Sequence, residues 1–388
     1  MEFSLSYANT APLRSLALLL RRGAGTMRVC LFAEMTVFTI FLPTSWTRII
    51  ACLMLVCSST QAVVVDNLYE AEVPVADHGA EALEQASLLA LQQVFIKVSG
   101  SVNVLENPVI LTELEKARSY VQQYSYTRDQ DADGDLSAKF EFDGAVISKL
   151  VVSSGAPFWT ANRPTVLVWV VVQNASGKQF VGADSQSAVL DAIQKSFSTR
   201  GVPLRVPLLD LEDTAALKVD EVWRLRAPPL LAASVRYGVQ DILAGRITEL
   251  STGEWLGDWA YISGNNRVDR TASADSIDTF MNSGASLVAE QMARNYSVAA
   301  SQADVGGVLM SVRGVNQYSD YAKIVSWLES LELIQHANVE EIEGDEIRLR
   351  LTAQAQASRL RKIIELNRKL SPLSNTSGSQ QLRYQWKN

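Results

Sequence analysis

The sequence predicts a protein of mixed α/β and α+β class, with three folded modules behind an N-terminal leader. Residues 165–172 are apolar on both strand faces and precede a helical repeat and a second strand, which is the order of a βαβ unit. Residues 308–386 show the element order βαββαβ, the ferredoxin-like plan. A chain of 388 residues has room for two or three domains, at roughly 100 to 200 residues each.

Residues 1–62 have the layout of a secretory leader. Arg48 precedes the apolar run 49–56, and Thr60 and Ala62 occupy the small-residue positions before a cleavage site. The run is shorter than the roughly 20 residues that a helix needs to cross a bilayer. We therefore expect cleavage after Ala62, no stable transmembrane anchor afterwards, and a location in the periplasm.

Two alternatives to cleavage stay open at this point. The leader is retained as a membrane anchor, or Cys57 is lipidated, although Met54 and Val56 are bulky for the positions before a lipidated cysteine. The length of the leader also suggests that translation begins at Met27 or Met35.

Charge and cysteine content argue against two kinds of site. Residues 1–62 hold five arginines and two glutamates, and subtracting these from the 35 basic and 42 acidic residues of the chain leaves 30 basic and 40 acidic. A net charge of -10 after the leader opposes nucleic-acid binding, which needs a basic surface. All three cysteines, Cys30, Cys52 and Cys57, lie in the leader, so the rest has no thiol for a disulfide or a metal.

The first module is expected over residues 63–158. It opens with a strand over 63–75, and Asp77 then caps a helix whose apolar stripe ends at Gly100. The other expected elements are a helix after Pro108 with Leu111, Leu114 and Ala117 inward, strands over 120–128 and 136–142, and a helix over 145–153.

The second module is expected over residues 159–298 as an α/β layer. Its βαβ unit consists of the strand 165–172, a helix that stops at Gly201, and a strand over 202–206. The later elements are a helix over 230–237, strands over 242–250 and around 255–261, and a long helix that Ser273 caps.

Three aromatic residues, Trp255, Trp259 and Tyr261, share one face of a strand in this module. Such a face is either a ligand platform or core beneath a helix. We expect core, because an amphipathic helix over 274–295 is available to cover it.

The third module is expected over residues 305–388 as the ferredoxin-like domain. It comprises a strand over 308–312, a helix striped by Tyr321 to Leu331, a hairpin around 343–345, a helix over 357–369 and a final strand over 382–386.

An acidic loop at residues 129–137 resembles the start of a calcium-binding loop. Asp129, Asp131, Asp133 and Asp135 supply carboxylates around Gly134, but position twelve is Phe140 in place of the usual Glu. We expect a solvated hairpin turn. Weak calcium binding is the alternative, since extracellular modules bind at only about 0.1 to 1 mM. No other cofactor is expected.

No catalytic arrangement is recognisable in the sequence. The two histidines, His78 and His336, belong to different modules, whereas zinc sites and serine hydrolases need imidazole beside specific partners. The Gly-x-Ser-x-Gly, Walker A and Gly-x-Gly-x-x-Gly motifs are absent. The five carboxylates within 340–346 surround one hairpin tip, and we expect them to be solvated, whereas a catalytic acid must be buried to raise its pKa.

Several phrases together resemble a family of gammaproteobacterial secreted proteins, the domain of unknown function 2066. They are VDNLYEAEV (65–73), FIKVSG (95–100), GAPFW (155–159), RPTVLVW (163–169) and GDW (257–259). The resemblance extends over about residues 63–370 and implies export without an assigned activity. The second module is also similar, in fold only, to the N-terminal domain of TolB and to the curli secretion lipoprotein.

We therefore expect a periplasmic protein that is not an enzyme and acts by associating with other envelope proteins, as an accessory factor in envelope assembly. The alternative is a hydrolase that uses Asp and Glu alone on cell-wall or glycan substrates.

Overall fold

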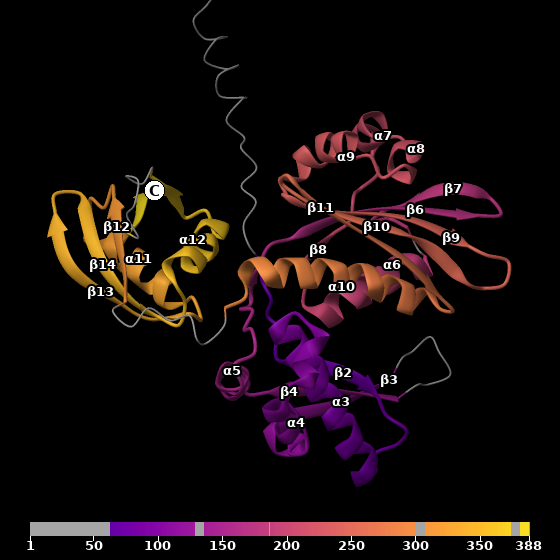
Figure 1. Cartoon of the computed structure of the whole chain (residues 1–388), viewed down its shortest axis with the longest axis horizontal. Coiled ribbons are helices and arrows are strands. Elements are labelled where there is room, and N and C mark those ends of the chain that lie inside the picture. Colours follow the sequence, from indigo (N-terminus) through magenta and orange to yellow (C-terminus); the bar gives the residue numbers. More distant parts are fainter. Residues whose placement is uncertain (1–62, 129–135, 186, 299–306, 374–380, 388) are drawn as a thin grey trace, which may run out of the picture. The chain divides into compact units, whose positions relative to one another are not determined.

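The computed structural model describes residues 63–128, 136–185, 187–298, 307–373 and 381–387. All of them belong to one compact unit, Ser58–Asn388 (Figure 1). The predicted leader lies outside the described residues. Mixed helices and sheets make up this unit, which confirms the predicted fold class. The described residues form three groups of elements, which we call the N-terminal, central and C-terminal groups.

The N-terminal group is a three-stranded antiparallel sheet of order β2-β4-β3 with helix α3 against it. Its elements are β1 (Val63–Val64), β2 (Glu70–Pro74), α3 (Ala80–Ser99), α4 (Pro108–Leu114), β3 (Val121–Arg128), β4 (Leu136–Phe142) and α5 (Gly144–Ser153). Phe140 on β4 and Phe95 on α3 are fully buried. Helix α3 ends at Gly100, whose φ of 76° lies in the left-handed region that a residue with a Cβ adopts at a cost.

Three details of this group differ from the prediction. The strand expected over 63–75 is two strands, because residues 66–69 make a turn. The cap of α3 is Gly79, and the Asp77 carboxylate accepts a hydrogen bond from the Gly79 N–H instead. On α4, Ile110 faces the core and Leu111 is exposed.

The central group is a six-stranded sheet of order β11-β10-β9-β6-β7, with β8 also paired to β6. Its strands are β6 (Val166–Asn174), β7 (Gly177–Val181), β8 (Leu204–Arg205), β9 (Asp241–Glu249), β10 (Trp255–Ser263) and β11 (Asn266–Ala274). Its helices are α6 (Ala188–Arg200), α7 (Leu211–Ala216), α8 (Val219–Trp223), α9 (Ala227–Ser234) and α10 (Ile277–Tyr296). Strand β6 runs parallel to β8 and β9, which gives the predicted βαβ unit.

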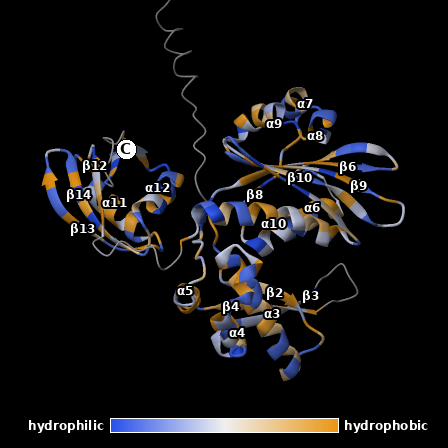
Figure 2. Cartoon of the chain, in the orientation of Figure 1, coloured by the Kyte–Doolittle hydropathy of each residue, from blue (hydrophilic) through white to orange (hydrophobic). Residues whose placement is uncertain are grey.

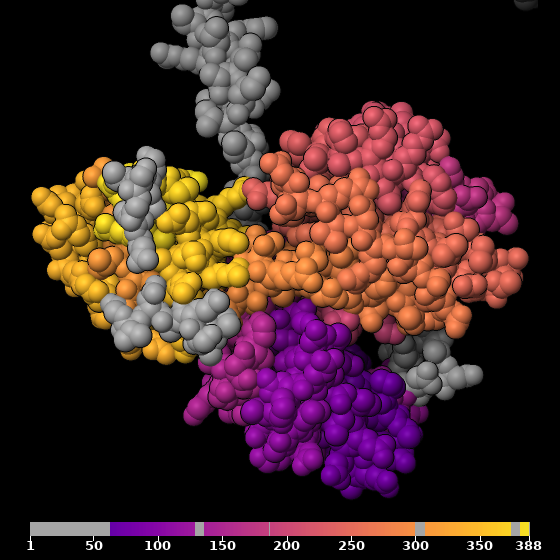
Figure 3. All heavy atoms as spheres, in the orientation of Figure 1, coloured from indigo at the N-terminus to yellow at the C-terminus, as the bar shows by residue number. Residues whose placement is uncertain are grey.

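Strand β6 is covered on both faces, as its apolar sequence predicts. Val168 packs in the cluster that contains α6 and α10, and its neighbour Trp169 packs in the cluster that contains α8 and α9. Hydrophobic residues run through the middle of the sheet (Figure 2). In the space-filling view the orange atoms of this group form a continuous surface (Figure 3).

The aromatic face of β10 is core, as predicted. Trp259 is 1% exposed and lies 5.4 Å from Phe280 of α10 between ring centroids. Two glycines make room for its indole: a Cβ on Gly245 of β9 or on Gly284 of α10 would lie within 3 Å of the ring. Strand β11 was not predicted, and α10 is capped by Ser276, since Ser273 belongs to that strand.

The C-terminal group is a five-stranded sheet of order β13-β14-β12-β16-β15. Its elements are β12 (Val308–Arg313), α11 (Tyr318–Glu329), β13 (Ile334–Glu343), β14 (Glu346–Ala353), α12 (Ala357–Leu366), β15 (Leu370–Pro372) and β16 (Leu382–Trp386). The predicted order βαββαβ is present with one strand added. The short strand β15 follows α12, and β16 returns between it and β12, parallel to β12.

None of the helices in the described part of the chain is both long enough and apolar enough to span a membrane.

We predict that Gly284→Ala destabilises the protein by about 1 to 3 kcal/mol, because its methyl group would press on the indole of Trp259. The change otherwise favours a helix by about 1 kcal/mol, so the sign of the effect reports the contact. Chemical denaturation measures the free energy of unfolding. In a Trp259→Phe background the same substitution is expected to cost less, and a neutral or stabilising Gly284→Ala in the wild-type background would contradict the packing described.

Candidate functional site

A buried arginine connects the N-terminal and central groups. Arg163 lies on the short strand β5 (Asn162–Arg163), which pairs antiparallel with β1, and its side chain is 0% exposed. Its guanidinium donates five hydrogen bonds, all to backbone carbonyls: those of Lys97, Trp159, Thr160, Arg200 and Gly201, at 2.7 to 3.2 Å. Every N–H donor of the guanidinium is therefore used.

The position of these carbonyls explains how the charge is tolerated. Lys97 is in the last turn of α3, and Arg200 and Gly201 end α6. The carbonyl ends of helices carry partial negative charge and stabilise a cation. The ring of Trp159 lies 3.8 Å from the guanidinium carbon and adds a cation–π contact. Burial lowers the pKa of Arg163 to about 9, so the group stays charged at neutral pH.

Lys97 is a second buried cation at this junction. Its ammonium donates to the carbonyls of Asn67 and Glu70, at 3.1 and 2.8 Å, and so fixes the turn between β1 and β2. Burial, with a smaller contribution from Arg163, lowers the pKa of Lys97 to about 8. The side chain is 4% exposed.

The C-terminal group contacts this junction through two polar links. The carboxylate of Glu332, in the loop after α11, accepts from the Ala161 N–H at 3.1 Å and from the Tyr69 hydroxyl at 3.5 Å. The guanidinium of Arg359 on α12 donates to the carbonyls of Arg294 and Asn295 at the end of α10. This last link again places a cation at a helix C-terminus.

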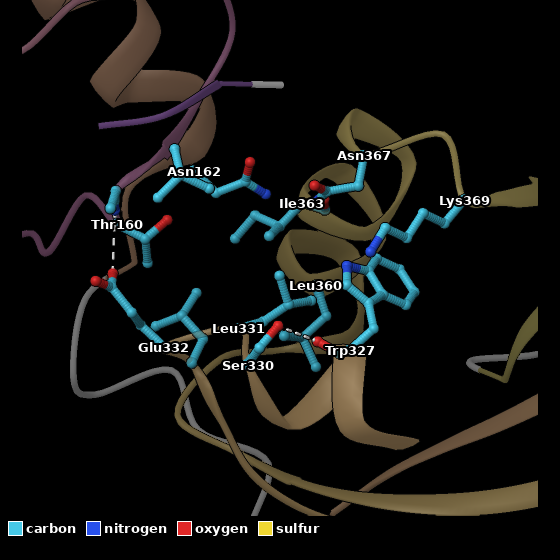
Figure 4. Close-up of a pocket in the computed structure, with 13 residues that line it drawn as sticks. Thr160, Asn162, Trp327, Ser330, Leu331, Glu332, Leu360, Ile363, Asn367 and Lys369 are labelled. Atoms are coloured by element: carbon cyan, nitrogen blue, oxygen red, sulfur yellow. Dashed lines mark hydrogen bonds between the residues drawn. The ribbon is translucent and has the colours of Figure 1, made fainter. Parts of the chain in front are cut away.

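A cavity of about 220 Å³ opens beside these links, between residues 160–162 and the C-terminal group (Figure 4). Its apolar lining comes from α11, the loop that follows it, α12 and β1: Trp327, Leu331, Leu333, Leu360, Ile363 and Val64. Its polar lining residues include Thr160, Asn162, Ser330, Glu332, Asn367 and Lys369. The cavity therefore combines an apolar wall with a few polar groups, which is the usual composition of a ligand site.

Asn162 is the polar residue that distinguishes this cavity. It is 8% exposed, and neither its side-chain nitrogen nor its side-chain oxygen has a hydrogen-bond partner. Among the described residues with such unpaired buried atoms, it alone has both a nitrogen and an oxygen without a partner. Figure 4 shows its side chain extending from β5 toward Ile363 and Asn367 of the C-terminal group. An unpaired buried polar group costs free energy, so it calls for a partner.

The local sequence explains why Asn162 and Arg163 face different surroundings. Pro164 restricts Arg163 to extended backbone. Consecutive residues of an extended segment point to opposite sides. Arg163 is fixed between the helix ends, and its neighbour therefore faces the cavity.

Charged groups occur at two places around the cavity. The ammonium of Lys369 lies 5.4 Å from the centre of the Trp327 ring, and Figure 4 shows the two side chains next to each other. Glu332 is the single carboxylate among the lining residues. Partial burial of its carboxylate raises the pKa of Glu332, although the residue as a whole is exposed.

The site residues predicted from the sequence, Asp129, Asp131, Asp133 and Asp135 of the calcium-like loop, lie outside the described residues. Within the described ranges, no group of three or more His, Cys, Asp or Glu residues is arranged to hold a metal ion.

The acidic hairpin between β13 and β14 is exposed and ion-paired. Arg348 pairs with Glu341 and Glu343, and Arg350 pairs with Glu340. These carboxylates line the outside of a sheet, as the sequence predicts for a solvated hairpin tip.

Two buried carboxylates belong to closed structural networks. Asp213 accepts from the Leu209 N–H, the Tyr237 hydroxyl and Arg236, and so fixes the segment before α7. Asp241, whose pKa is raised by burial, accepts from the Tyr261 hydroxyl at 2.6 Å. Neither lines the cavity.

Comparison with known proteins gives a family match over part of the chain. The model of a family described as Domain of unknown function (DUF8605) matches residues 62–160, about a quarter of the chain, over the elements β1 to α5. This agrees with the expectation of an uncharacterised domain. The cavity residues Thr160 and Val64 fall inside the matched range, and Asn162 is the second residue after it.

No curated protein matches the chain. Among solved structures, the chain is similar to one titled "Crystal structure of uncharacterized protein", with 11% identity, coverage of 34% of this chain and 97% of that chain, and a TM-score of 0.15. A likeness at this level supports no conclusion.

We predict that Lys97 makes the protein more stable as the pH rises from about 8 to about 10.5, its ordinary pKa. In this window the unfolded chain still binds the proton that the folded chain has lost, so unfolding takes up a proton and becomes harder. The full effect is at most about 3 to 4 kcal/mol, from about 1.4 kcal/mol per pH unit over the interval between the two pKa values. It is present above pH 10.5 and absent below pH 8.

The measurement is urea denaturation between pH 7.5 and 9.5, which stays below the range where tyrosines titrate. Lys97→Met retains the aliphatic stem and serves as the comparison, because only the difference in slope between the two proteins reports Lys97. Parallel pH profiles would show that the ammonium is not buried as described.

Proposed function

We propose that this chain is an exported protein of the cell envelope that acts by binding other envelope proteins. The leader pattern of residues 1–62 supports the location. The cavity beside β5 supports the mode of action, because it offers an apolar wall and an unpaired carboxamide to an incoming group. This unpaired amide is the observation on which the proposal depends most.

The alternative is a hydrolase that works with carboxylates on cell-wall or glycan substrates. Such enzymes need two carboxyl groups about 5 to 9.5 Å apart in a cleft. The lining of the cavity supplies one, Glu332. Three carboxylates of the described chain are buried. Asp213 and Asp241 are held in networks with tyrosines, and Asp320 on α11 is not among the lining residues of the cavity. These observations favour binding over hydrolysis.

The finer family assignment is part of the same proposal. The phrases at 65–73, 95–100, 155–159 and 163–169 resemble the secreted domain of unknown function 2066. The α/β layer of the central group suits the proposed likeness to the N-terminal domain of TolB. The residues that build the junction, Lys97, Trp159 and Arg163, lie within these phrases. We infer that the proteins which share these phrases also share the junction built by the three residues.

The location is tested on the protein from its native cells. We expect the periplasmic fraction to contain it, and N-terminal sequencing to begin at Val63. Val63 is the first residue of β1, so cleavage there would leave the described fold complete. Recovery of the chain in the cytosol with residues before Val63 attached would contradict the proposed export.

Association through the cavity is tested by site-specific photocrosslinking in intact cells. A photoreactive residue replaces Ser330, which lines the cavity and is exposed. The matched control replaces Tyr318, which is 81% exposed at the other end of α11 and lies outside the lining. We expect a protein adduct from position 330 that position 318 does not give. Equal adducts at both positions, or none at 330, would contradict the proposal.

A further inference from the structure

We propose that the cavity binds an extended peptide segment of the partner, with one large aliphatic side chain against the apolar wall and the Asn162 carboxamide paired to the peptide group beside it. This inference rests on the proposed function and names the chemistry that the same site recognises.

The carboxamide of Asn162 restricts what the ligand offers. It presents one acceptor oxygen and one donor nitrogen, and both are buried without partners. A carboxylate would satisfy the nitrogen and leave the oxygen unpaired, and an apolar ligand would satisfy neither. A peptide group carries an N–H and a C=O and can pair with both. Exchange of the nitrogen and oxygen positions of the amide would leave this argument unchanged.

The size of the cavity limits the ligand to one large side chain and its peptide group. A cavity of about 150 Å³ in another protein holds a benzene ring, whereas sites for drug-sized ligands begin at about 300 Å³. The volume of about 220 Å³ lies between these limits. Leu360 and Ile363 of α12 and Leu331 after α11 give the wall an aliphatic character, which favours Leu or Ile as the anchor.

The positive charge of Lys369 at the edge of the cavity indicates which type of residue lies next to the aliphatic one in the ligand peptide. The Lys369 ammonium is exposed beside the Trp327 ring and favours an acidic residue next to the aliphatic one. Glu332 is held on the opposite side of the lining by the Ala161 N–H, which separates it from this position (Figure 4).

The probe is N-acetyl-Leu-Asp-amide, titrated into the purified protein. Nitrogen-15 NMR follows the side-chain amide signals of Asn162, which are assigned by their loss in Asn162→Leu. We expect saturable shifts of these signals. N-acetyl-Ala-Asp-amide, which lacks the anchor, and the probe with an N-methylated leucine, which lacks the N–H, are each expected to bind at least about tenfold more weakly.

Asn162→Leu separates a ligand-binding role from a structural one. The substitution removes two unpaired buried polar atoms at nearly constant volume, so the unliganded protein is expected to melt at the same or a higher temperature. Its affinity for the probe, followed through the Trp327 indole signal, is expected to fall at least about tenfold. Asn338→Leu, at an exposed position of β13, is the matched control and leaves the affinity unchanged.

Two results would overturn the inference. Absence of saturable shifts with the probe would show that water alone fills the cavity. A clear loss of thermal stability in Asn162→Leu would show that the amide has a structural partner. If crosslinking from position 330 still gives a specific adduct, the proposed function stands and the peptide chemistry is wrong. If that adduct is also missing, both fail.

Discussion

The guanidinium of Arg163 is the interaction on which the arrangement of the N-terminal and central groups depends. Two helices from different groups, α3 and α6, end at the same point, and their unpaired carbonyls would be buried there without a donor. One planar cation with five N–H groups satisfies carbonyls of both helices and of its own loop. Among the described residues no carboxylate forms an ion pair with it. The partial negative charges of backbone carbonyl groups therefore compensate the positive charge of the guanidinium.

Two other cations near the junction also donate to backbone carbonyls. Lys97 binds two carbonyls of the turn that precedes β2, and Arg359 binds two at the end of α10. Arg163, Lys97 and Arg359 therefore each connect segments far apart in the sequence through main-chain oxygens. Asn162 is the exception. It sits in the same strand as Arg163, yet its polar atoms have no such partners.

Local patterns predicted most elements of the fold and little of the candidate site. The apolar β6, the helix stops at Gly100 and Gly201 and the order of the C-terminal elements followed from periodicity and turn chemistry. The predicted cap of α10 was wrong because two serines precede the helix, and Ser276 caps it in place of Ser273. Strand β11 was missed because it is a polar edge strand without the apolar pattern of a buried one. The cavity was not predictable, because its lining joins residue 64 to residue 369. A polar pair, Asn162 and Arg163, between apolar segments was the one local signal.

Strand β5 consists of two residues with opposed tasks, and this has a mechanical consequence. The backbone that carries Asn162 to the cavity is the backbone that holds Arg163 between the helix ends. One peptide bond joins Asn162 to Arg163, so a displacement of Asn162 would also displace Arg163, whose guanidinium joins the ends of α3 and α6. A ligand that displaced the backbone of Asn162 would therefore also act on the hydrogen bonds of Arg163, and amide hydrogen exchange at the ends of those two helices would report the effect.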